Sequence, residues 1–241
     1  LDIPSGVCGC SGKPSPCAVL AHATVTFEAP KPGNILPSAR PYIGQLHIAP
    51  VGIPLEVRQR YLPSLALLLP DCVGLAPNPY TFEHKNQAGR VLVVGGSKGM
   101  SGAPELAALS ALRASSGLVT VACPSGLENQ IRAALPDILT LPLGSNLGLN
   151  LEPNPDVAAN FNDAAVEEIT AHLEADRSWG CIIIGPGLGQ SASAPALLKA
   201  VLEKSSSPLL LDADALNILA ANPAWLPLLR PQDVLTPHPG E

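Results

Sequence analysis

Short apolar runs alternate with segments of helical periodicity from about residue 90 to the end of the chain. Runs of four or five apolar residues are typical of parallel strands buried on both faces, and such strands need crossover helices between them. The predicted strands are Arg90–Val94, Leu118–Ala122, Cys181–Ile184, Pro208–Leu211 and Asp233–Thr236, and the predicted helices are Pro104–Ala114, Gly126–Ala134 and Ala164–Ala175. This pattern predicts an α/β fold with a mostly parallel sheet and helices on both faces.

Two of these helices present a predicted core face. Leu106, Leu109 and Leu112 recur at helical spacing in the first, and Val166, Ile169 and Leu173 do so in the third. We therefore expect these six side chains to pack against the sheet.

The first part of the chain has a different pattern. It predicts a loop, a strand at Ala23–Phe27, a proline-rich turn and a second strand at Gln45–Ala49. A short helix is expected within Arg58–Leu69, before Pro70. We place one domain at residues 1–54, a linker at 55–83 and a second domain at 84–241, in which 146–162 forms a long surface loop.

Composition narrows the possible partners. Hydrophobic residues make up 46% of the 241 residues and the net charge is −6, so no broad cationic surface is available for nucleic acid. Prolines interrupt the most apolar region, which excludes a membrane span.

The six cysteines are expected to be mostly reduced thiols, and the loop with Cys8, Cys10 and Cys17 is expected to hold no metal. Because the start shows no targeting segment, we expect a cytoplasmic protein.

Small and polar residues follow four of the predicted strands. The four segments are Gly95–Ala103, Gly185–Gly189, Asp212–Asp214 and Pro237–Glu241. Ligands of open α/β sheets gather at the carboxyl ends of the strands, and glycines let backbone N–H groups approach a phosphate. Although one glycine cluster is equally well a tight turn, four together favour a phosphorylated ligand. Gly99 after Lys98 excludes a Walker A loop.

A dinucleotide-binding fingerprint is an alternative for the same region. Gly187, Gly189 and Ala192 have the spacing G-x-G-x-x-A after a predicted strand, and Asp212 ends the next strand. This spacing favours an NAD(P)-dependent oxidoreductase whose fingerprint helix is 193–204. The oxidoreductase interpretation, however, gives no role to residues 213–217 or 236–241. A non-catalytic nucleotide-binding protein also fits the glycine turns.

Two polar residues at these strand ends are candidates for ligand contacts. Asp214 is predicted to be the N-cap of a helix at 215–220, which leaves Asp212 free for a ligand. His238 stands between two prolines that fix its backbone, as a recognition residue requires, although a surface-loop histidine is the plainer interpretation.

Four motifs together resemble the ATP- or ADP-dependent NAD(P)H-hydrate dehydratases. These are Gly95–Ala103, Ile184–Gly189, Leu211–Asn217 and Leu235–Glu241, and their order and spacing also match. The resemblance implies a ribokinase-like fold that binds hydrated NADH or NADPH and phosphorylates the added hydroxyl with ATP or ADP and Mg²⁺. By motif, Ala103, Gly187 and His238 would contact the hydrated cofactor, while Asp212 and Asn217 would shape the pocket.

The first residues resemble the last part of the NAD(P)H-hydrate epimerases, which have a Rossmann-like α/β domain. The motifs are Asp2–Gly6 and Thr24–Gly33, continuing through Tyr42–Gly44. The resemblance implies that Asp2 contacts the substrate catalytically and that Ser5 helps to hold K⁺. A carboxylate can shuttle the proton when a hydrate epimerises at the carbon beside nitrogen.

The chain departs from both families in extent. It stops before the Gly-Thr-Gly-Asp motif that serves phosphoryl transfer, and the epimerase body would precede Leu1. We therefore expect a bifunctional, homo-oligomeric repair enzyme of which this segment alone is inactive.

Overall fold

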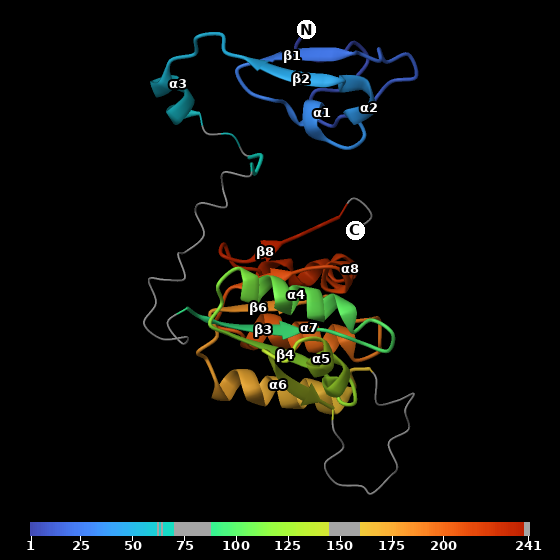
Figure 1. The fold of residues 1–241 in the computed structure, drawn as a ribbon, viewed down its shortest axis with the longest axis vertical. Helices are drawn as coiled ribbons and strands as arrows, with labels where there is room; N and C mark the ends of the chain where they lie inside the picture. The colour runs from blue at the N-terminus through green and yellow to red at the C-terminus, as the bar shows by residue number, and fades with distance from the viewer. Residues whose placement is uncertain (62, 64, 70–87, 145–159, 239–241) are drawn as a thin grey trace, which may run out of the picture. The chain divides into compact units, whose positions relative to one another are not determined.

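The chain divides into two compact units, Leu1–Pro70 and Asp71–Glu241, each described by itself. The computed structural model describes residues 1–241 except 62, 64, 70–87, 145–159 and 239–241, which are grey in Figure 1. The boundary between the units falls within the predicted linker 55–83. Most of that linker and of the predicted loop 146–162 lies outside the described residues.

The first unit is built on two parallel strands. Strands β1 (Ala23–Phe27) and β2 (Gln45–Ala49) pair in register from Ala23 with Gln45 to Phe27 with Ala49, which confirms both predicted strands. The short helices α1 (Pro32–Ile35) and α2 (Arg40–Ile43) connect them. Val7, Ala39 and Ile43 form a small buried core.

The predicted helix within Arg58–Leu69 is displaced in the structure. Helix α3 runs over Leu55–Arg60 and ends at Tyr61. Pro63 explains why the helix does not continue, since a proline in a helix interior lacks an N–H and clashes with the preceding turn.

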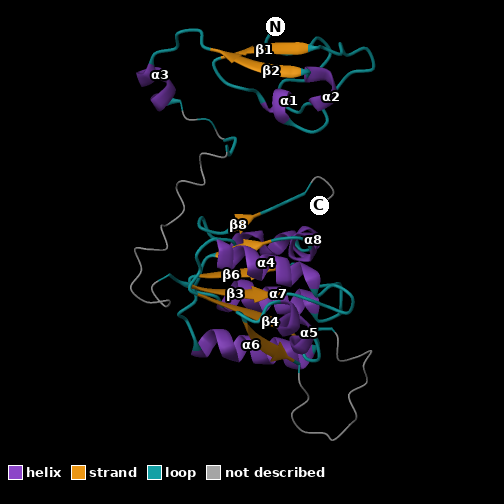
Figure 2. Cartoon of the chain, viewed as in Figure 1, coloured by secondary structure: helices purple, strands orange, loops and turns teal. Residues whose placement is uncertain are grey.

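The second unit contains a six-stranded sheet in the order β5-β4-β3-β6-β7-β8, with every pairing parallel (Figure 2). The strands are β3 (Arg90–Val94), β4 (Leu118–Pro124), β5 (Leu139–Leu143), β6 (Cys181–Ile184), β7 (Leu209–Leu211) and β8 (Val234–Leu235). Five of them were predicted. The sixth, β5, lies at an edge of the sheet, where Pro142 is tolerated because one side of an edge strand needs no ladder hydrogen bonds.

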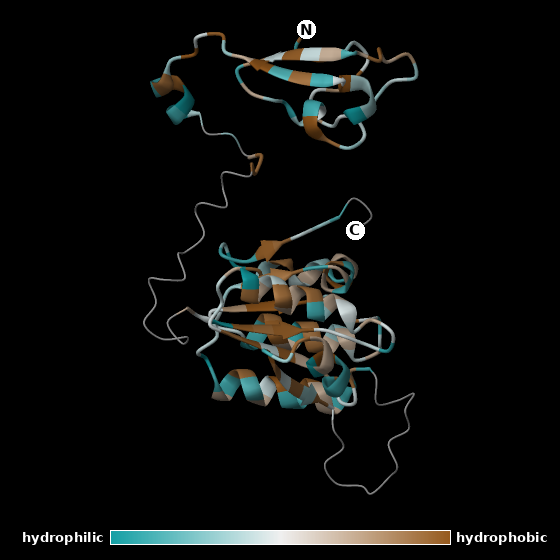
Figure 3. Ribbon diagram, viewed as in Figure 1, coloured by the Kyte–Doolittle hydropathy of each residue, from teal (hydrophilic) through white to brown (hydrophobic). Residues whose placement is uncertain are grey.

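Helices cover the sheet in two layers. They are α4 (Gly102–Arg113), α5 (Glu128–Ala134), α6 (Asp163–Ala175), α7 (Ala194–Lys204) and α8 (Asp214–Ala221), followed by the 3-10 helix η3 (Pro223–Leu228). Residues of α4 and α5 share one buried core with β4, whereas residues of α6, α7 and α8 share another with β6 and β7. The apolar strands between these layers are brown in Figure 3. Both faces of the sheet are therefore covered, as predicted.

The helix faces agree with the predicted patterns in one case and differ in the other. In α6, Ile169 and Leu173 are buried and Val166 is partly buried against the same core. In α4, Leu106 is 67% exposed, whereas Leu112 is partly buried against the core beside the buried Ala108 and Ala111. Small side chains let α4 lie close to the sheet, a choice that apolar periodicity alone does not reveal.

The winding of the sheet reverses between two neighbouring strands. From β3 the chain proceeds through α4 to β4 and then to β5 on one side, while from β6 it proceeds to β7 and β8 on the other. In such sheets the crevice for a ligand opens at the carboxyl ends of the two strands where the order reverses. Here these strands are β3 and β6. Among the described helices, none is long and apolar enough to cross a membrane.

Candidate functional site

The turns that follow β3 and β6 pack directly on each other. The Gly96 N–H donates to the Pro186 carbonyl oxygen at 3.1 Å, and the Ser97 hydroxyl donates to the Gly187 carbonyl oxygen at 2.9 Å. A Cβ on Gly95 would lie only 2.2 Å from the Pro186 oxygen. The close approach of the two backbones therefore depends on the absence of a side chain at Gly95.

Two of the predicted substrate contacts meet at this place. Gly187 adopts a φ of +61°, and a Cβ there would lie 2.4 Å from the Met100 carbonyl oxygen and 3.3 Å from the Ala103 Cβ. Ala103 lies in the first turn of α4 and is exposed. The structure thus brings Ala103 and Gly187 together on the two sides of the crevice.

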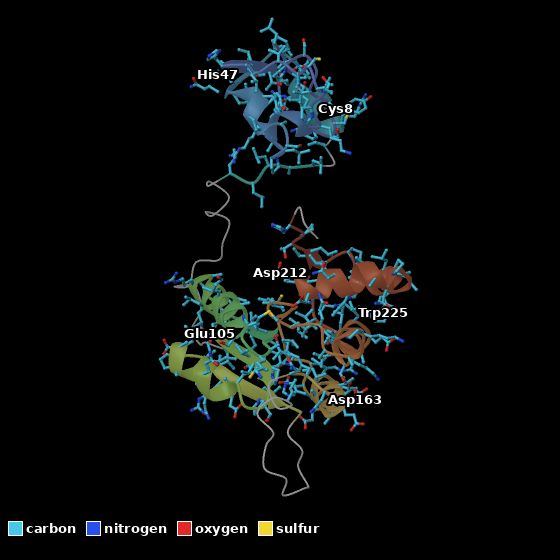
Figure 4. All side chains as sticks on the ribbon, turned by 90° about the vertical axis from the view of Figure 1, so that its right-hand side faces the viewer. Cys8, His47, Glu105, Asp163, Asp212 and Trp225 are labelled. Atoms are coloured by element: carbon cyan, nitrogen blue, oxygen red, sulfur yellow. The ribbon has the colours of Figure 1, made fainter. Side chains whose placement is uncertain are left out.

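Asp212, in the turn after β7, contacts the segments that follow β6 and β8. Its Oδ1 accepts a hydrogen bond from the Thr236 hydroxyl at 2.7 Å, and the contact of Asp212 with a ligand stays a prediction. A Cβ on Gly185 would lie 1.8 Å from the Asp212 carbonyl oxygen. Figure 4 labels Asp212 near the start of α8. The ends of β6, β7 and β8 are therefore joined through one residue.

Asp214 does not cap α8, and the N-cap prediction is wrong. The helix begins at Asp214 itself, the N-cap position is Ala213 with a φ of +48°, and no side chain caps the end. The Asp214 carboxylate instead accepts the Gly189 N–H at 2.8 Å. That contact occupies a backbone donor that a dinucleotide fingerprint would direct at a pyrophosphate.

Asn217 lines a shallow pocket of about 250 Å³ beside these turns. Its lining is neutral and consists of Gln190, Ser191, Pro195, Asn217, Ile218, Ala221 and Asn222. The Ser191 hydroxyl is buried with no hydrogen-bond partner among the described residues. His238 is exposed and lies two residues after Thr236. Asn217 and His238 therefore belong to the same edge of the sheet as the three turns.

Two thiols of the second unit are poorly suited to nucleophilic chemistry. Burial raises the pKa of Cys123 in β4 to about 12, and the nearby Glu128 carboxylate adds to the effect. Burial likewise raises the pKa of Cys181. Their environment is that of structural cysteines.

The first unit places Asp2 in a dense polar network. Its Oδ1 accepts from the Lys31 ammonium at 2.5 Å and from the Thr26 hydroxyl at 3.0 Å. The hydrogen bond from Lys31 is the main reason that the pKa of the Asp2 carboxyl lies below its usual value. The two sequence motifs contained Asp2 and its partners Thr26 and Lys31 but did not indicate that these side chains contact one another.

The predicted K⁺ ligand Ser5 offers an incomplete site. Ser5 is exposed, and its carbonyl oxygen accepts the Val19 N–H at 2.9 Å. Among the described residues no three His, Cys, Asp or Glu side chains gather as a metal site. Ser5 can supply one oxygen to a hard cation, but it cannot hold the cation alone.

Comparison with known proteins agrees with this geometry. The chain is 35% identical to the bifunctional NAD(P)H-hydrate repair enzyme Nnr of Moorella thermoacetica and 36% identical to that of Coxiella burnetii, in each case over 100% of this chain. It spans 43% and 44% of their lengths, less than half of each relative. Residues 1–33 match the family described as YjeF-related protein N-terminus.

The fold also has a counterpart among solved structures. A ribokinase-like superfamily protein from Enterococcus faecalis superposes with a TM-score of 0.55 and 22% sequence identity, covering 73% of this chain and 57% of that one. This likeness supports the ribokinase-like fold.

One family accounts for all the turns of the second unit. Residues 91–241, more than half of the chain, match the family described as NAD(P)H-hydrate dehydratase. The match includes the segment 187–192, so the oxidoreductase alternative is not favoured. The chain therefore belongs to the NAD(P)H-hydrate dehydratase family.

Proposed function

We propose that the second unit takes part in repairing nicotinamide nucleotides by dehydrating hydrated NADH or NADPH at the expense of ATP or ADP. The observation that carries this proposal is the contact between the β3 and β6 turns, where Gly187 lies against Met100 and Ala103. It lies at the reversal of the strand order, where open α/β sheets bind nucleotides. Family membership and the names of the relatives support the same reaction.

In this proposal the site residues have two different roles in binding. Ala103, Gly187 and His238 contact the hydrated dinucleotide, and Asp212 and Asn217 shape the pocket around it. When bound, a nucleotide with Mg²⁺ would supply a phosphoryl group for the added hydroxyl. Loss of the resulting phosphate, together with a proton from the adjacent ring carbon, would restore the ring double bond. The chain's own residues hold the hydrated ring in place and limit the access of water.

We further propose that the first unit belongs to the epimerase of a bifunctional protein. In this proposal Asp2 moves a proton to and from the hydrate hydroxyl, and Ser5 supplies one oxygen to K⁺. The match of residues 1–33 and the network around Asp2 support this role. We also propose a cytoplasmic homo-oligomer, which cell fractionation and light scattering would test.

The dehydratase proposal is tested by recovery of dihydronicotinamide absorbance. The full-length protein that contains this chain would be incubated with hydrated NADH and either ATP or ADP. We expect nucleotide-dependent recovery, which Gly187→Ala reduces at least tenfold because its Cβ would meet the Met100 carbonyl oxygen. Asp137→Asn, an exposed change in the turn before β5, serves as the control. Recovery independent of nucleotide, or unaffected by Gly187→Ala, would contradict the proposal.

A further inference from the structure

The two carboxylate oxygens of Asp2 have different surroundings. Oδ1 accepts three hydrogen bonds, from the Lys31 ammonium at 2.5 Å, the Thr26 hydroxyl at 3.0 Å and the Phe27 N–H at 3.3 Å. Within the described part of the chain, Oδ2 accepts none. The three hydrogen bonds therefore fix the carboxylate by Oδ1 and leave Oδ2 without a protein donor in that part of the chain.

The Lys31 ammonium is fully used by this unit. It has three N–H donors, and they go to the Asp2 carboxylate, the Thr26 hydroxyl at 3.0 Å and the Phe27 carbonyl oxygen at 3.0 Å. Since none is left for a ligand, Lys31 does not bind substrate through its ammonium. Its effect on a reaction has to pass through Asp2.

The backbone around Asp2 is held as firmly as its side chain. Asp2 has a φ of +64°, an uncommon conformation for a residue with a side chain. Its N–H donates to the Val25 carbonyl oxygen at 2.6 Å. The buried Asn34 donates to the Asp2 carbonyl oxygen at 3.1 Å and accepts the Lys31 N–H at 2.8 Å. One buried amide therefore fixes the backbones of both members of the ion pair.

A stabilising salt bridge is the simplest other explanation, and it accounts for less. The side chains of Lys31 and Asp2 are 34% and 46% exposed, and ion pairs with such exposure contribute little to stability. Unusual backbone conformations that the surrounding structure enforces tend to lie at functional positions. The ion pair between Lys31 and Asp2 is better explained by the way it orients Oδ2 of Asp2.

We propose that Lys31 is a positioning residue that fixes the Asp2 carboxylate by its Oδ1, so that Oδ2 is the atom that exchanges a proton with the hydrated nicotinamide. This inference rests on the proposed epimerase role of the first unit. It assigns Thr26 and Asn34 to the support of the same pair.

The proton transfer that this geometry serves is balanced. Oδ2 takes the proton of the hydrate hydroxyl, the C–O bond becomes a carbonyl, and the electron pair of the adjacent C–N bond returns to the ring nitrogen. Rotation and reclosure on the other face reverse each step, and Oδ2 returns the proton. No oxidant or further reactant is needed, and Asp2 ends in its starting state.

Three variants of the full-length protein test the assignment. In Lys31→Met the neutral side chain leaves Oδ1 without its cation. In Lys31→Arg a cation is kept. The control, Lys13→Met, removes an exposed lysine of the same unit. We expect Lys31→Met to lower kcat for epimerisation about 100-fold with little change in KM, as misplacement of a reacting group does. Lys31→Arg should recover most of the loss. Equal loss in both variants, or none in Lys31→Met, overturns the proposal.

A titration separates this proposal from the epimerase proposal on which it rests. The pKa of the Asp2 carboxyl would be followed by carbon NMR in the same variants. We expect it to rise in Lys31→Met and to stay low in Lys31→Arg and Lys13→Met, and an unchanged pKa in Lys31→Met overturns the assignment. If the pKa rises but the unmodified protein does not epimerise the hydrate, the epimerase proposal fails and the positioning of Asp2 by Lys31 stands.

Discussion

Ala213 carries a backbone conformation that its side chain opposes. Its φ of +48° and ψ of −120° lie in a region that glycine adopts far more readily than alanine. The strain falls between Asp212 and Asp214, which bind Thr236 and the Gly189 N–H. Those two contacts hold the turn in place against the strain.

Replacing Ala213 with glycine should therefore stabilise the protein. We expect Ala213→Gly to raise the free energy of unfolding by about 1 kcal/mol, because relief of strain exceeds the added entropy of the unfolded chain. Ala220→Gly, in the regular part of α8, should lower it by about 1 kcal/mol. Urea unfolding followed by tryptophan fluorescence measures both, and a loss of stability in Ala213→Gly would show that the turn is not strained.

Gly185 is the position least able to accept a side chain. In Gly185→Ala the new Cβ would lie 1.8 Å from the Asp212 carbonyl oxygen and 2.8 Å from the Ala215 Cβ. We expect a loss of roughly 3 kcal/mol or more, since packed backbone must move. Gly102→Ala, with no atom within 4 Å of its Cβ, is the matched control and should be neutral or slightly stabilising. Equal unfolding midpoints for the two variants would refute the close approach.

Residue identities indicated the site but not its internal contacts. Motifs pointed to Asp2, Gly187 and Asp212, because several short motifs in the same order and spacing are specific to a family even where each alone has a structural explanation. The pairing of Asp2 with Lys31 could not be predicted, since their contact depends on how β1 folds back on the chain start. Asp214 was misassigned because local capping rules ignore a competing donor, the Gly189 N–H, that is distant in sequence.

At the scale of elements, α6 has the best-defined helix start. Asn162 caps it by accepting the Ala165 N–H at 3.0 Å, and its side-chain amide also donates to the Gly144 carbonyl oxygen at 3.2 Å after β5. The residue therefore stabilises the helix and connects it to the edge of the sheet.

The two contacts of Asn162 can be separated by substitution. Asn162→Ala should cost about 1 to 2 kcal/mol of unfolding free energy, the usual loss for an N-cap. Asn162→Asp keeps the acceptor but loses the donor to Gly144, so it should cost less. Chemical denaturation of the two variants checks the order. A larger loss in Asn162→Asp would mean that the sheet contact dominates.

Elements with a continuous apolar run were the ones that sequence could predict. Strands β3 and β6 occur at their predicted bounds, because four or five consecutive apolar residues have few places other than the centre of a sheet. Strand β5 was missed because its pattern of Leu, Thr and Pro is that of an exposed edge, which resembles a loop. The core face of α4 was predicted in part, because Leu112 packs against the core but buried alanines form much of that face.

At the scale of the whole molecule, two carboxylates of the second unit are expected to make its unfolding free energy depend on pH in acid. The Ser178 hydroxyl and N–H, with Arg90, lower the pKa of Asp176 to about 2. Burial raises the pKa of Asp233, but N–H groups of Arg230 and Leu209 and the Arg230 side chain outweigh it, so the net shift is downward. Both carboxylates are therefore better stabilised as anions in the folded state than in the unfolded state.

Stability of the second unit should accordingly fall in acid. A carboxyl whose folded pKa is depressed stabilises the protein above its unfolded pKa, near 4, and loses this contribution as the pH falls through the folded value. We expect the unfolding free energy to decline from about pH 5 to about pH 2, the folded pKa of Asp176, and Asp233→Asn to flatten the decline. Both tryptophans, Trp179 and Trp225, lie in this unit, so fluorescence reports on it alone. A level profile would exclude these two carboxylates as the cause.

The reversal of the strand order places the two turns after neighbouring strands that take part in both cores. Leu92 and Val94 of β3 and Ile182 and Ile184 of β6 lie in the core with α6, α7 and α8, whereas Val93 and Ile183 of the same two strands face the core with α4 and α5. Main-chain hydrogen bonds join the two strands directly. A substitution in either core therefore acts on both strands. The distance between the two turns is consequently inherited together with the packing of both faces of the sheet.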